Sequence, residues 1–577
     1  MFSILITCGH ELAALGAARS LGRAGHKVTV ALPVGVRAAV EGSRYVTAAV
    51  PSPNPWTHQH DFRRFLLAEA PKHDALLPIS EAAIFATAQV CQDLGTTLLL
   101  MPPDHNLHYS LSKYHATAAA QAVGLPTPPT VFLSDPGGSG QPLQQREKLR
   151  SLGYPLLIKH DNFQTSDGRY VKGNTTRCTT ELQALALLAE LAERGAQTIA
   201  QTTVPGHGVG VFLLRFNGKI ALRFAHRRLH EVPHTGGVSS LRVSIHDEQL
   251  LQGAERLLSH IGFEGVAMCE FRKPDTGPPR FLEINGRLWG SLALALHSGV
   301  DFPKAWLQLA QGATWPPQAD YPDGVLCRNL FPGEALHLAS VLRSAEVAPL
   351  KKIWAVAEQV ALSLDRTVCH DHFVFDDLGS AKRHARLVVS QVFSSAQKRA
   401  ARFVETRSLG CLLDRERRAT QAKRARLASP RRILVMCLGN LCRSPFAQKK
   451  LQELTLGKNI TVESAGFLSH MDRPTPARFV QLAQGFGVDL SAHRARRVKP
   501  SQVEAADLVL LMDAPNLRRF RTEFPRAIEK TFLIGIFAGL PQPEIPDPYL
   551  LPIDQAETSY RLLQTCCESI GRLVLSK

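Results

Sequence analysis

Apolar positions in the first hundred residues form short runs that alternate with a helical pattern. Residues 11–25 carry apolar side chains at helical spacing. Four apolar runs have the length of buried strands, and they cover residues 3–7, 27–33, 45–50 and 75–79. Strands that alternate with helices are typical of βαβ units with a parallel sheet. We therefore predict a parallel α/β domain over residues 1–103.

The pattern changes near residue 104. The next apolar runs predict strands at 155–160, 197–204, 209–225 and 266–273. Asn217-Gly218, inside the third of these runs, predicts a hairpin turn. This mixed α+β pattern predicts a second domain over residues 104–320 and a mostly helical extension over residues 321–395.

A second βαβ system fills the C-terminal part of the chain. A strongly basic stretch over residues 396–430 precedes it, and a new apolar strand begins at Arg432. We predict a separate domain over residues 431–577. The whole chain is therefore expected to combine α/β and α+β domains.

The composition is that of a globular protein. Of the 577 residues, 45% are hydrophobic and 20% are charged, which excludes a mostly disordered, collagen-like or coiled-coil chain. No apolar run approaches the ~18 residues that a membrane helix needs, so we expect no membrane span. The first residues indicate a strand rather than a signal peptide. The eleven cysteines follow no repeating frame, which indicates reduced thiols and a cytoplasmic protein.

The net charge of +17 is concentrated in one stretch. Residues 398–432 hold twelve Lys and Arg against three acidic residues. Aromatic residues are sparse there, which argues against a surface that stacks single-stranded nucleic acid. We predict a solvated basic linker helix and no specific nucleic-acid partner. Contact with an anionic membrane is the alternative, and no motif supports it.

The strongest chemical signal lies in residues 433–448. Cys437 opens a loop after a strand, and Gly439 stands where the backbone can bend freely. Ser444 is expected to cap the helix that follows, with Pro445 in its first turn. Inward backbone N–H groups and the helix N-terminus would then form a nest for an anion.

Two further residues complete a site for phosphoryl transfer. Arg443 closes the loop and can hold phosphate oxygens with two parallel hydrogen bonds. The same positive field favours the thiolate of Cys437, which is a nucleophile at phosphorus. Asp547, between two prolines, is the natural acid for the leaving oxygen. The alternatives are a buried cysteine in a strand-to-helix turn and an ordinary turn aspartate.

These residues resemble the low-molecular-weight protein tyrosine phosphatases over about 432–577. Five motifs follow the family order: CLGNLCRSP, VESAGF, DLSAHRARRV, ADLVLLMD and IPDPY. The resemblance implies a four-stranded parallel sheet. It makes Cys437 the nucleophile, Arg443 the phosphate ligand and Asp547 the acid and then the base. The residues that match the network supporting the loop are Asn440, Ser444, Ser464 and His493.

The family also includes arsenate reductases and protein-arginine phosphatases. Arsenate reduction needs shuttling cysteines, and the adjacent Cys566 and Cys567 suit that relay poorly. Cys442 either forms a reversible disulfide with Cys437 or is a small buried residue of the loop. Leu441 stands where arginine-specific relatives carry threonine, so we predict a preference for phosphotyrosine over phosphoarginine.

A second constellation is dispersed over the N-terminal two thirds. Glu283, Asn285 and Arg287 alternate, so an extended backbone would place them on one face. Together with Glu270, the two acids and the amide supply oxygen ligands that suit Mg²⁺. Cationic side chains that can neutralise a triphosphate are Lys113, Lys159 and Arg287. Taken singly, each residue is more commonly a solvated surface charge.

This set resembles the carboxylate–amine ligase branch of the ATP-grasp superfamily over about 1–320. The resemblance implies that Lys113 and Lys159 contact nucleotide phosphates and that Gln201 and Val204 belong to the segment holding adenine. The implied Mg²⁺ ligands are Glu270, Glu283 and Asn285. The chain departs from the family pattern at Thr202 and at residues 210–212, where acidic residues are usual. The implied reaction forms an acyl phosphate from ATP and a carboxylate, which an amine then attacks.

Three histidines four residues apart, His226, His230 and His234, invite a zinc interpretation. Pro233 would interrupt a helix there, and no carboxylate or thiol completes the set. We instead predict a basic loop near the acyl phosphate, with Arg227 and Arg228 facing anions.

The sequence therefore predicts a fused enzyme that uses ATP and Mg²⁺ in one part and hydrolyses phosphoesters in the other. The expected substrates are a phosphotyrosine-containing protein or a small phosphoester, and an unidentified carboxylate and amine. Two alternatives remain open. The nucleotide-binding part could regulate the phosphatase without ligating anything, or the chain could be a scaffold with two vestigial sites.

Overall fold

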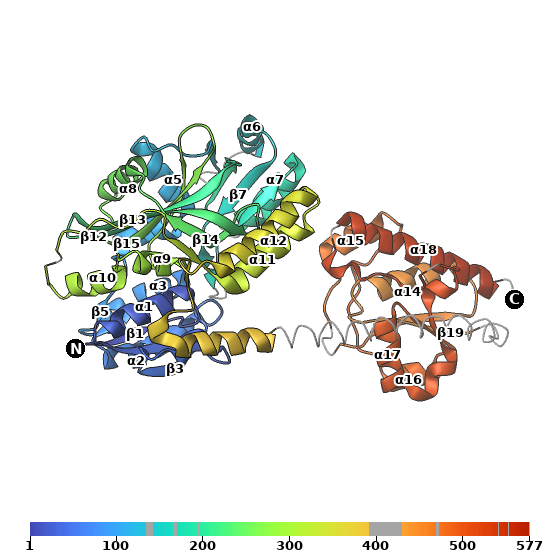
Figure 1. Cartoon of the computed structure of the whole chain (residues 1–577). Helices are drawn as coiled ribbons and strands as arrows, with labels where there is room; N and C mark the ends of the chain where they lie inside the picture. Colours follow the sequence, from blue (N-terminus) through green and yellow to red (C-terminus); the bar gives the residue numbers. More distant parts are fainter. Residues whose placement is uncertain are drawn as a thin grey trace. The chain divides into compact units, whose positions relative to one another are not determined.

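The computed structural model describes residues 1–133, 142–164, 170–193, 196–314, 316–391, 430–468, 472–540, 542–551 and 553–575. The chain forms two compact units, Met1–Phe393 and Ser394–Lys577 (Figure 1). The predicted basic linker over 396–430 lies outside the described residues except for Pro430. No helix within the described ranges is both long and apolar enough to span a membrane.

The first unit begins with a five-stranded parallel sheet, as its apolar pattern predicts. The strand order is β3-β2-β1-β4-β5, with β1 and β4 adjacent at the centre. The strands are β1 (Ser3–Ile6), β2 (Lys27–Pro33), β3 (Ala48–Ser52), β4 (Ala75–Leu77) and β5 (Leu98–Leu99). The helices α1 (Leu12–Arg23), α2 (Gln59–Glu69) and α3 (Glu81–Ala88) connect them.

Two sheets follow in the same unit, with all strand pairs antiparallel except β17 with β18, which confirms the mixed α+β pattern. A four-stranded sheet has the order β10-β7-β11-β6, and a seven-stranded sheet has the order β16-β15-β12-β13-β14-β17-β18. The smaller sheet contains β6 (Thr130–Phe132), β7 (Leu156–His160), β10 (Thr175–Cys178) and β11 (Thr198–Thr202). The larger sheet begins with β12 (His207–Phe216), β13 (Lys219–Val232), β14 (Val238–Ser244), β15 (Gly265–Lys273) and β16 (Arg280–Asn285).

The predicted hairpin turn joins β12 to β13. Asn217 and Gly218 have φ angles of 50° and 78°, the left-handed conformation that this tight turn requires. A further short strand pair, β8 (Phe163–Gln164) with β9 (Tyr170–Val171), lies outside the two larger sheets. The helices of this region are α4 (Asp104–Leu111), α5 (Lys113–Ala122), α6 (Pro142–Leu152), α7 (Glu181–Glu193), α8 (Glu248–His260), α9 (Leu292–His297) and α10 (Phe302–Ala310).

One hydrophobic core joins the parallel sheet to the seven-stranded sheet. Helix α1 packs against α9 and α10, and side chains of β1 share a cluster with Phe212, Phe224 and Trp289. A Cβ atom on Gly16 would lie 3.0 Å from the Leu292 side chain, so glycine permits this close helix contact. The first unit is therefore built around a continuous apolar interior.

Residues 321–391 are mostly helical, as predicted, but they also supply two strands to the larger sheet. Strand β17 (Leu326–Arg328) pairs with β14, and β18 (Cys369–His370) pairs with β17. The helical turns and helices are η4 (Leu330–Glu334), α11 (Ala335–Arg343), α12 (Pro349–Leu364) and a helix over 378–391. The apolar pattern did not predict these strands because each is only two or three residues long.

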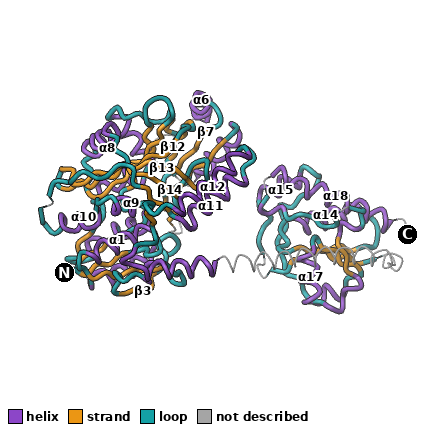
Figure 2. The backbone as a smooth tube through the Cα atoms, in the orientation of Figure 1, coloured by secondary structure: helices purple, strands orange, loops and turns teal. Residues whose placement is uncertain are grey.

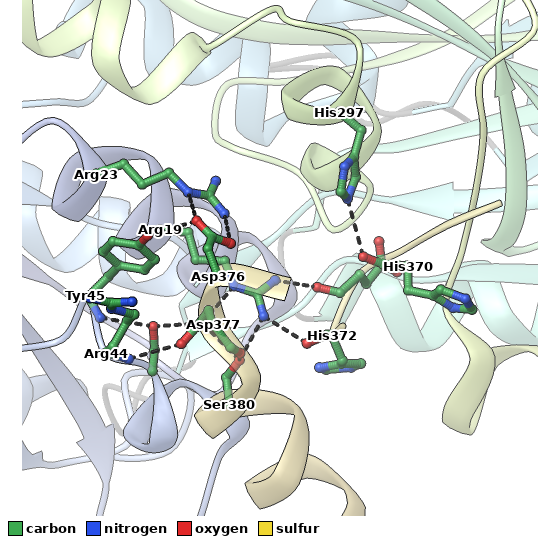
Figure 3. A network of polar contacts seen from close by, with 12 residues as sticks. Arg19, Arg23, Arg44, Tyr45, His297, His370, His372, Asp376, Asp377 and Ser380 are labelled. Carbon is green, nitrogen blue, oxygen red and sulfur yellow. Dashed lines mark hydrogen bonds and ion pairs between the residues drawn. The ribbon is translucent and has the colours of Figure 1, made fainter. Parts of the chain in front are cut away.

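Buried ion pairs fix the end of this segment to the rest of the unit (Figure 3). The Arg19 guanidinium on α1 donates to Asp377 at 2.9 Å and to the carbonyl oxygen of Asp371 at 2.7 Å. Arg242 on β14 forms a second buried ion pair with Asp371. Arg23 donates to both carboxylate oxygens of Asp376 at 2.7 and 2.8 Å. The segment is therefore an integral part of the first unit.

The second unit contains a four-stranded parallel sheet, which confirms the prediction. Its order is β20-β19-β21-β22, with helices on both faces (Figure 2). The strands are β19 (Arg432–Cys437), β20 (Thr461–Gly466), β21 (Leu508–Leu511) and β22 (Thr531–Leu533). The helices are α14 (Arg443–Leu454), α15 (Ala477–Gln484), α16 (Pro500–Ala505), α17 (Ala514–Glu523) and α18 (Ile553–Leu575).

Strand β19 contributes to two cores because both faces of this sheet are covered. Ile433 and Val435 pack in one apolar cluster, and Leu434 and Met436 pack in the other. A strand covered on both faces appears in the sequence as a continuous apolar run. Its carboxyl end delivers Cys437 to the edge of the sheet, next to the start of α14.

Candidate functional site

The loop after β19 curls tightly between the strand and helix α14. Asn440 adopts a left-handed conformation with φ of 52°. The loop lies against Gly466 of β20, where a Cβ atom would come within 2.9 Å of the Asn440 nitrogen. The backbone bends at Gly439, as expected, and the residue with the left-handed conformation is the next one, Asn440. An asparagine tolerates this conformation better than most side chains.

The start of α14 also differs from its prediction. Ser444 was expected to cap the helix, but α14 begins at Arg443 and Cys442 occupies the capping position without a side-chain hydrogen bond. The Ser444 hydroxyl instead donates to the Cys437 sulfur at 3.0 Å. Pro445 lies in the first turn, as predicted. The Ser444 hydroxyl therefore forms a hydrogen bond with the sulfur and does not cap the helix.

The Cys437 sulfur is surrounded by hydrogen-bond donors. The Asn440 backbone N–H donates to it at 3.2 Å, in addition to the Ser444 hydroxyl. The side chain is almost fully buried. These donors would stabilise negative charge on the sulfur, and the thiolate is the nucleophilic form of cysteine.

The four predicted loop-support residues lie in one hydrogen-bonded network. The Asn440 side-chain amide donates to the Ser444 hydroxyl at 3.0 Å and to the Ser464 hydroxyl at 2.9 Å. His493 contacts the Asn440 carbonyl oxygen through Nε2 at 2.9 Å. Gln448 was not predicted, and it accepts a hydrogen bond from Ser464 at 2.6 Å. Every member restrains the loop that presents the sulfur.

Two carboxylates and one carbonyl hold the Arg443 guanidinium. Nη1 donates to Asp513 at 2.6 Å and to the Ile545 carbonyl oxygen at 2.9 Å. Nη2 donates to Asp547 at 2.5 Å. Burial would lower the pKa of Arg443, but Cys437 and the two carboxylates raise it. The cation is thus fixed beside the sulfur by three groups on two segments, one that contains Asp513 and one that contains Ile545 and Asp547.

Asp513 was missed by sequence reasoning. It follows β21 and caps α17 by accepting a hydrogen bond from the Asn516 N–H at 2.8 Å. The sequence did contain a pattern that could have identified Asp513. This acid stands at the carboxyl end of a buried strand, just before Ala514-Pro515, where a helix begins. In a parallel sheet, that end lies at the same edge as Cys437.

A cavity of about 300 Å³ opens above the loop. Cys437, Cys442, Arg443 and Asp547 line it, and the Asp547 side chain is 46% exposed. Its apolar lining residues are Leu438, Leu441, Leu468 and Tyr549. Burial raises the pKa of the Cys442 thiol, and Cys437 raises it further. The Cys437 sulfur, the Arg443 guanidinium and the Asp547 carboxylate therefore line one space together with apolar side chains.

The candidate metal ligands of the first unit lie on neighbouring strands. Glu270 on β15 and Glu283 on β16 are opposite each other in the strand register. The Asn285 side chain, on the same face as Glu283, donates to that carboxylate at 3.1 Å. Two carboxylates and an amide oxygen at one place on a sheet fit the hard oxygen ligands of Mg²⁺.

Two lysines surround Glu283. Lys113, at the start of α5, has its Nζ 3.6 Å from the Glu283 carboxylate. Lys159 on β7 is buried, and burial lowers the pKa of Lys159 to about 8. Burial would also raise the pKa of Glu283, but the two lysines lower it to about 2. Positive and negative charges are thus concentrated where a nucleotide phosphate and its metal would bind.

Sequence reasoning missed an acid that joins this site from the parallel sheet. Glu81, in the first turn of α3, accepts hydrogen bonds from Arg287 at 3.2 Å and from Asn162 at 3.3 Å. Glu81, Lys113, Glu283, Asn285 and Arg287 all line one small cavity. The sequence signal was Ser80-Glu81 shortly after β4, where the Ser80 side chain caps α3.

The proposed adenine residues do not line that cavity within the described ranges. Gln201 is buried at the end of β11, where its amide donates to Thr130 at 3.0 Å. Val204 is half-buried between β11 and β12. Their assignment to the nucleotide remains a prediction.

The predicted basic loop around His226 was wrong. These residues belong to β13, which runs to Val232 and is hydrogen-bonded to strands on both sides. Arg228 forms an ion pair with Glu270 rather than facing a free anion. Among the residues that the structure describes, no three His, Cys, Asp or Glu side chains group as metal ligands.

The three histidines of this region have separate environments. His226 packs against the Phe212 ring at 4.8 Å in the core. His230 pairs with the buried Glu334 at 2.8 Å, and His234 contacts the Ser340 hydroxyl at 3.0 Å. The spacing that suggested zinc therefore reflects positions along a strand and its turn.

Comparisons with known proteins match both parts of the chain. Residues 432–574 match the family model for low molecular weight phosphotyrosine protein phosphatase. Residues 196–330 match a model described as ATP-grasp in the biosynthetic pathway with Ter operon. The biotin carboxylase of Campylobacter jejuni is 16% identical with a TM-score of 0.45, covering 56% of this chain and 74% of that one.

Two curated relatives match the C-terminal domain. The probable low molecular weight protein-tyrosine-phosphatase EpsP of Ralstonia nicotianae is 33% identical over 132 residues, which are 23% of this chain and 88% of the relative. The low molecular weight protein-tyrosine-phosphatase Ptp of Acinetobacter johnsonii is 35% identical over 137 residues, 23% of this chain and 91% of the relative. Through its C-terminal domain the chain belongs to the low molecular weight protein-tyrosine-phosphatase family, and residues 196–330 of its N-terminal part match an ATP-grasp model.

Proposed function

We propose that the C-terminal domain hydrolyses phosphotyrosine esters through a phosphocysteine at Cys437. The environment of the sulfur carries this proposal: two donors point at it, and Arg443 and Asp547 line the same cavity. A nucleophile, a cation for the phosphate and an acid for the leaving group are the three parts that the reaction needs.

The reaction takes place in two steps. The Cys437 sulfur attacks phosphorus, and the bond from phosphorus to the tyrosyl oxygen breaks as protonated Asp547 gives that oxygen a proton. Water then attacks the phosphocysteine while Asp547 takes its proton. The phosphorus–sulfur bond breaks, and inorganic phosphate leaves.

Arg443 is positioned to exchange one partner for the phosphate. Asp513 and the Ile545 carbonyl hold Nη1, whereas Nη2 contacts the half-exposed Asp547. Phosphate oxygens would replace Asp547 on Nη2, which frees that carboxyl group to reach the leaving oxygen. Asp513 is therefore a positioning residue that keeps the guanidinium in place during the exchange.

The cavity rim suits an aromatic leaving group. Leu438, Leu441 and Tyr549 present apolar surface beside the loop, on which a tyrosine ring can pack. A guanidinium group would lose its hydration there without gaining a partner. The substrate proposed is therefore a phosphotyrosine-containing protein or a small aryl phosphoester.

Turnover of p-nitrophenyl phosphate by the purified full chain tests this proposal. We expect release of p-nitrophenol and phosphate that needs no added nucleotide, because every proposed catalytic group lies in the second unit. Absence of turnover from a folded, reduced protein would contradict the proposal.

For the ATP-grasp domain we propose ATP-dependent joining of a carboxylate to an amine. The convergence of Lys113 and Lys159 on Glu283 supports it, since these lysines can neutralise triphosphate charge. Mg²⁺, when bound to Glu270, Glu283 and Asn285, would neutralise further charge on the phosphates. Arg287 lines a cavity with Lys113 and Glu283 and would supply a third cation for the triphosphate.

Release of ADP distinguishes the remaining possibilities. A ligase releases ADP only when a suitable carboxylate and amine are both added, which a screen of metabolite pairs can detect. Tight ATP binding without such turnover would favour the regulatory alternative, in which nucleotide controls the phosphatase. Absence of ATP binding would leave the ATP-grasp domain as a scaffold.

A further inference from the structure

Two of the described residues that line the cavity above the loop between β19 and α14, the phosphate loop, are arginines with different surroundings. Arg443 is 2% exposed at the bottom of the cavity and pairs with Asp513 and Asp547. Arg473 lines the same cavity but is exposed, so its side chain lies at the mouth. Its guanidinium contacts the Tyr549 hydroxyl at 3.5 Å. No carboxylate of the described residues forms an ion pair with Arg473.

The segment that carries Arg473 is attached to the phosphate loop. The Thr475 hydroxyl donates to the Leu441 carbonyl oxygen, inside the loop, at 2.9 Å. The Arg473 carbonyl oxygen accepts a hydrogen bond from the Ala495 N–H at 2.9 Å, and the Asp472 N–H donates to the Ala495 carbonyl oxygen at 2.8 Å. The backbone of Arg473 therefore has a fixed position relative to the phosphate loop.

A second cation, Arg478, contacts the same tyrosine as Arg473. Its guanidinium donates to the Tyr549 carbonyl oxygen and lies 4.6 Å from the centre of the Phe479 ring. Burial raises the pKa of the Cys442 thiol, and the charges of Arg443 and Arg478 oppose that rise, so Arg478 acts on the phosphate loop. Among the residues that the structure describes, no carboxylate pairs with Arg478 either.

The acids near this mouth leave its positive charge uncompensated. Asp547 pairs with Arg443 at the bottom of the cavity. Asp472 is exposed and is not among the residues that line the cavity. The segment hydrogen-bonded through Ala495 adds two exposed arginines, Arg494 and Arg496. An excess of one charge sign around a cleft attracts ligands of the opposite sign, so the mouth favours anionic groups.

The proposed substrate would place its own backbone at this mouth. Its phosphate must reach Cys437, which is 3% exposed, and its ring would then pack against Leu441 and Tyr549. The residues before and after the phosphotyrosine would remain outside the cavity, beside Arg473. A carboxylate on one of them can form charge-assisted hydrogen bonds with the guanidinium.

We propose that Arg473 selects phosphotyrosine residues that have aspartate or glutamate beside them. This inference rests on the proposed phosphatase activity and narrows its substrate to phosphotyrosine in an acidic segment of a protein. Charges at the rim of a binding site chiefly set specificity and the association rate. The preference should therefore appear in kcat/KM and should shrink at high salt, because salt screens exposed charges.

Initial rates of the full chain on three phosphotyrosine peptides test the preference. The peptides are identical except that the residues on both sides of the phosphotyrosine are Glu, Gln or Lys. For the wild type we expect kcat/KM to fall in the order Glu, Gln, Lys. Each step should be about two- to five-fold, which is the range for an exposed ion pair.

Substitution of Arg473 tests whether this side chain makes the selection. Arg473→Gln should bring the Glu and Gln peptides close to equal kcat/KM, and Arg473→Glu should reverse the order in favour of the Lys peptide. A loss of packing alone would not reverse a charge preference. Thermal unfolding checks that each variant folds.

Arg526→Gln is the matched control, because Arg526 is also an exposed arginine of this domain. It lies shortly before β22, at the opposite edge of the parallel sheet from Cys437. This variant should keep the wild-type order of the three peptides.

Equal kcat/KM for the three peptides, from a wild-type protein that hydrolyses p-nitrophenyl phosphate, would overturn this inference and leave the proposed activity in place. A preference for the Glu peptide that survives Arg473→Glu would also overturn it. If the wild type hydrolyses neither the peptides nor p-nitrophenyl phosphate, the proposed phosphatase activity is refuted, and this inference with it.

Discussion

The phosphate loop and the ATP-grasp cavity bring charged and hydrogen-bonding groups together in opposite ways. The loop concentrates its nucleophile, donors and cation in residues 437–444, with supporting hydrogen bonds from neighbouring segments. The ATP-grasp cavity collects single charged residues from α3, α5 and β16, which are far apart in the sequence. A site within one loop depends on the conformation of that loop, whereas a dispersed site depends on how several helices and strands pack together.

This contrast predicts different sensitivity to substitution. A change in the loop should remove one activity nearly completely and leave the first unit unaffected. A change in the cavity should weaken binding in steps, because several charges share the task of neutralising the triphosphate.

The largest effect is expected for Cys437→Ser. A serine hydroxyl is a much weaker nucleophile than a thiolate, so turnover of p-nitrophenyl phosphate should be lost while thermal unfolding stays unchanged. Cys442→Ser in the same loop is the matched comparison and should retain turnover under reducing conditions, since Cys442 has no proposed role in the hydrolysis itself. Full activity of Cys437→Ser would refute the covalent mechanism.

Asp547→Ala should slow phosphate-ester hydrolysis by about 10²–10⁴-fold, the usual contribution of general acid–base catalysis. The loss should be larger for phosphotyrosine than for p-nitrophenyl phosphate, because p-nitrophenol leaves more easily without a proton. Asp489→Ala, an exposed aspartate of a turn in the same domain, provides the control. Equal rates for Asp547→Ala and wild type would remove Asp547 from the mechanism.

Glu283→Ala should weaken binding of Mg²⁺-ATP, because it removes a metal ligand and leaves Lys113 and Lys159 without their shared counter-charge. Titration calorimetry of wild type and variant measures the change. Phosphatase turnover should stay the same unless nucleotide regulates it. Wild-type protein that binds no ATP would overturn the assignment of this cavity.

ATP binding should also weaken as the pH rises through about 8. Burial lowers the pKa of Lys159 to about 8, so its ammonium is charged below that pH and becomes neutral above it. Each pH unit above the pKa should cost up to about ten-fold in affinity, because binding then requires uptake of a proton. Lys159→Arg keeps its charge and should remove this dependence, so an unchanged pH profile would contradict the role of Lys159.

The smallest effect concerns substrate choice. Leu441→Thr should shift the ratio of initial rates towards phosphoarginine peptides, since a hydroxyl replaces apolar surface beside the loop. Wild type should prefer phosphotyrosine peptides. Faster release from phosphoarginine by the wild type would show that Leu441 does not select the substrate.

The sequence predicted the phosphatase domain more completely than the ATP-grasp domain. The strands before Cys437, the four-stranded sheet and the support network around Asn440 follow from short, ordered motifs. The missed partner was Asp513, because its contact with Arg443 joins segments seventy residues apart. The left-handed conformation of Asn440 was also not predicted.

In the first unit, contacts between segments far apart in the sequence determine features that the local sequence pattern could not predict. The region around His226 looked like a loop because its charges and histidines hide the strand pattern, yet pairing with β12 and β14 makes it extended. Glu81 could not be placed because it reaches Arg287 only after the parallel sheet packs against the larger one. Strands β17 and β18 were too short to leave an apolar signature.

The central claim is that Cys437 carries the phosphoryl group during turnover. Mass spectrometry of the Asp547→Ala protein, mixed with p-nitrophenyl phosphate and quenched in acid, tests it directly. This variant should accumulate the intermediate, because p-nitrophenol leaves without the acid while hydrolysis of the phosphocysteine lacks its base. We predict one phosphoryl group on the peptide containing Cys437 and none in Asp547→Ala/Cys437→Ser. Turnover without any phosphorylated Cys437, or with the phosphoryl group on another residue, would contradict the account.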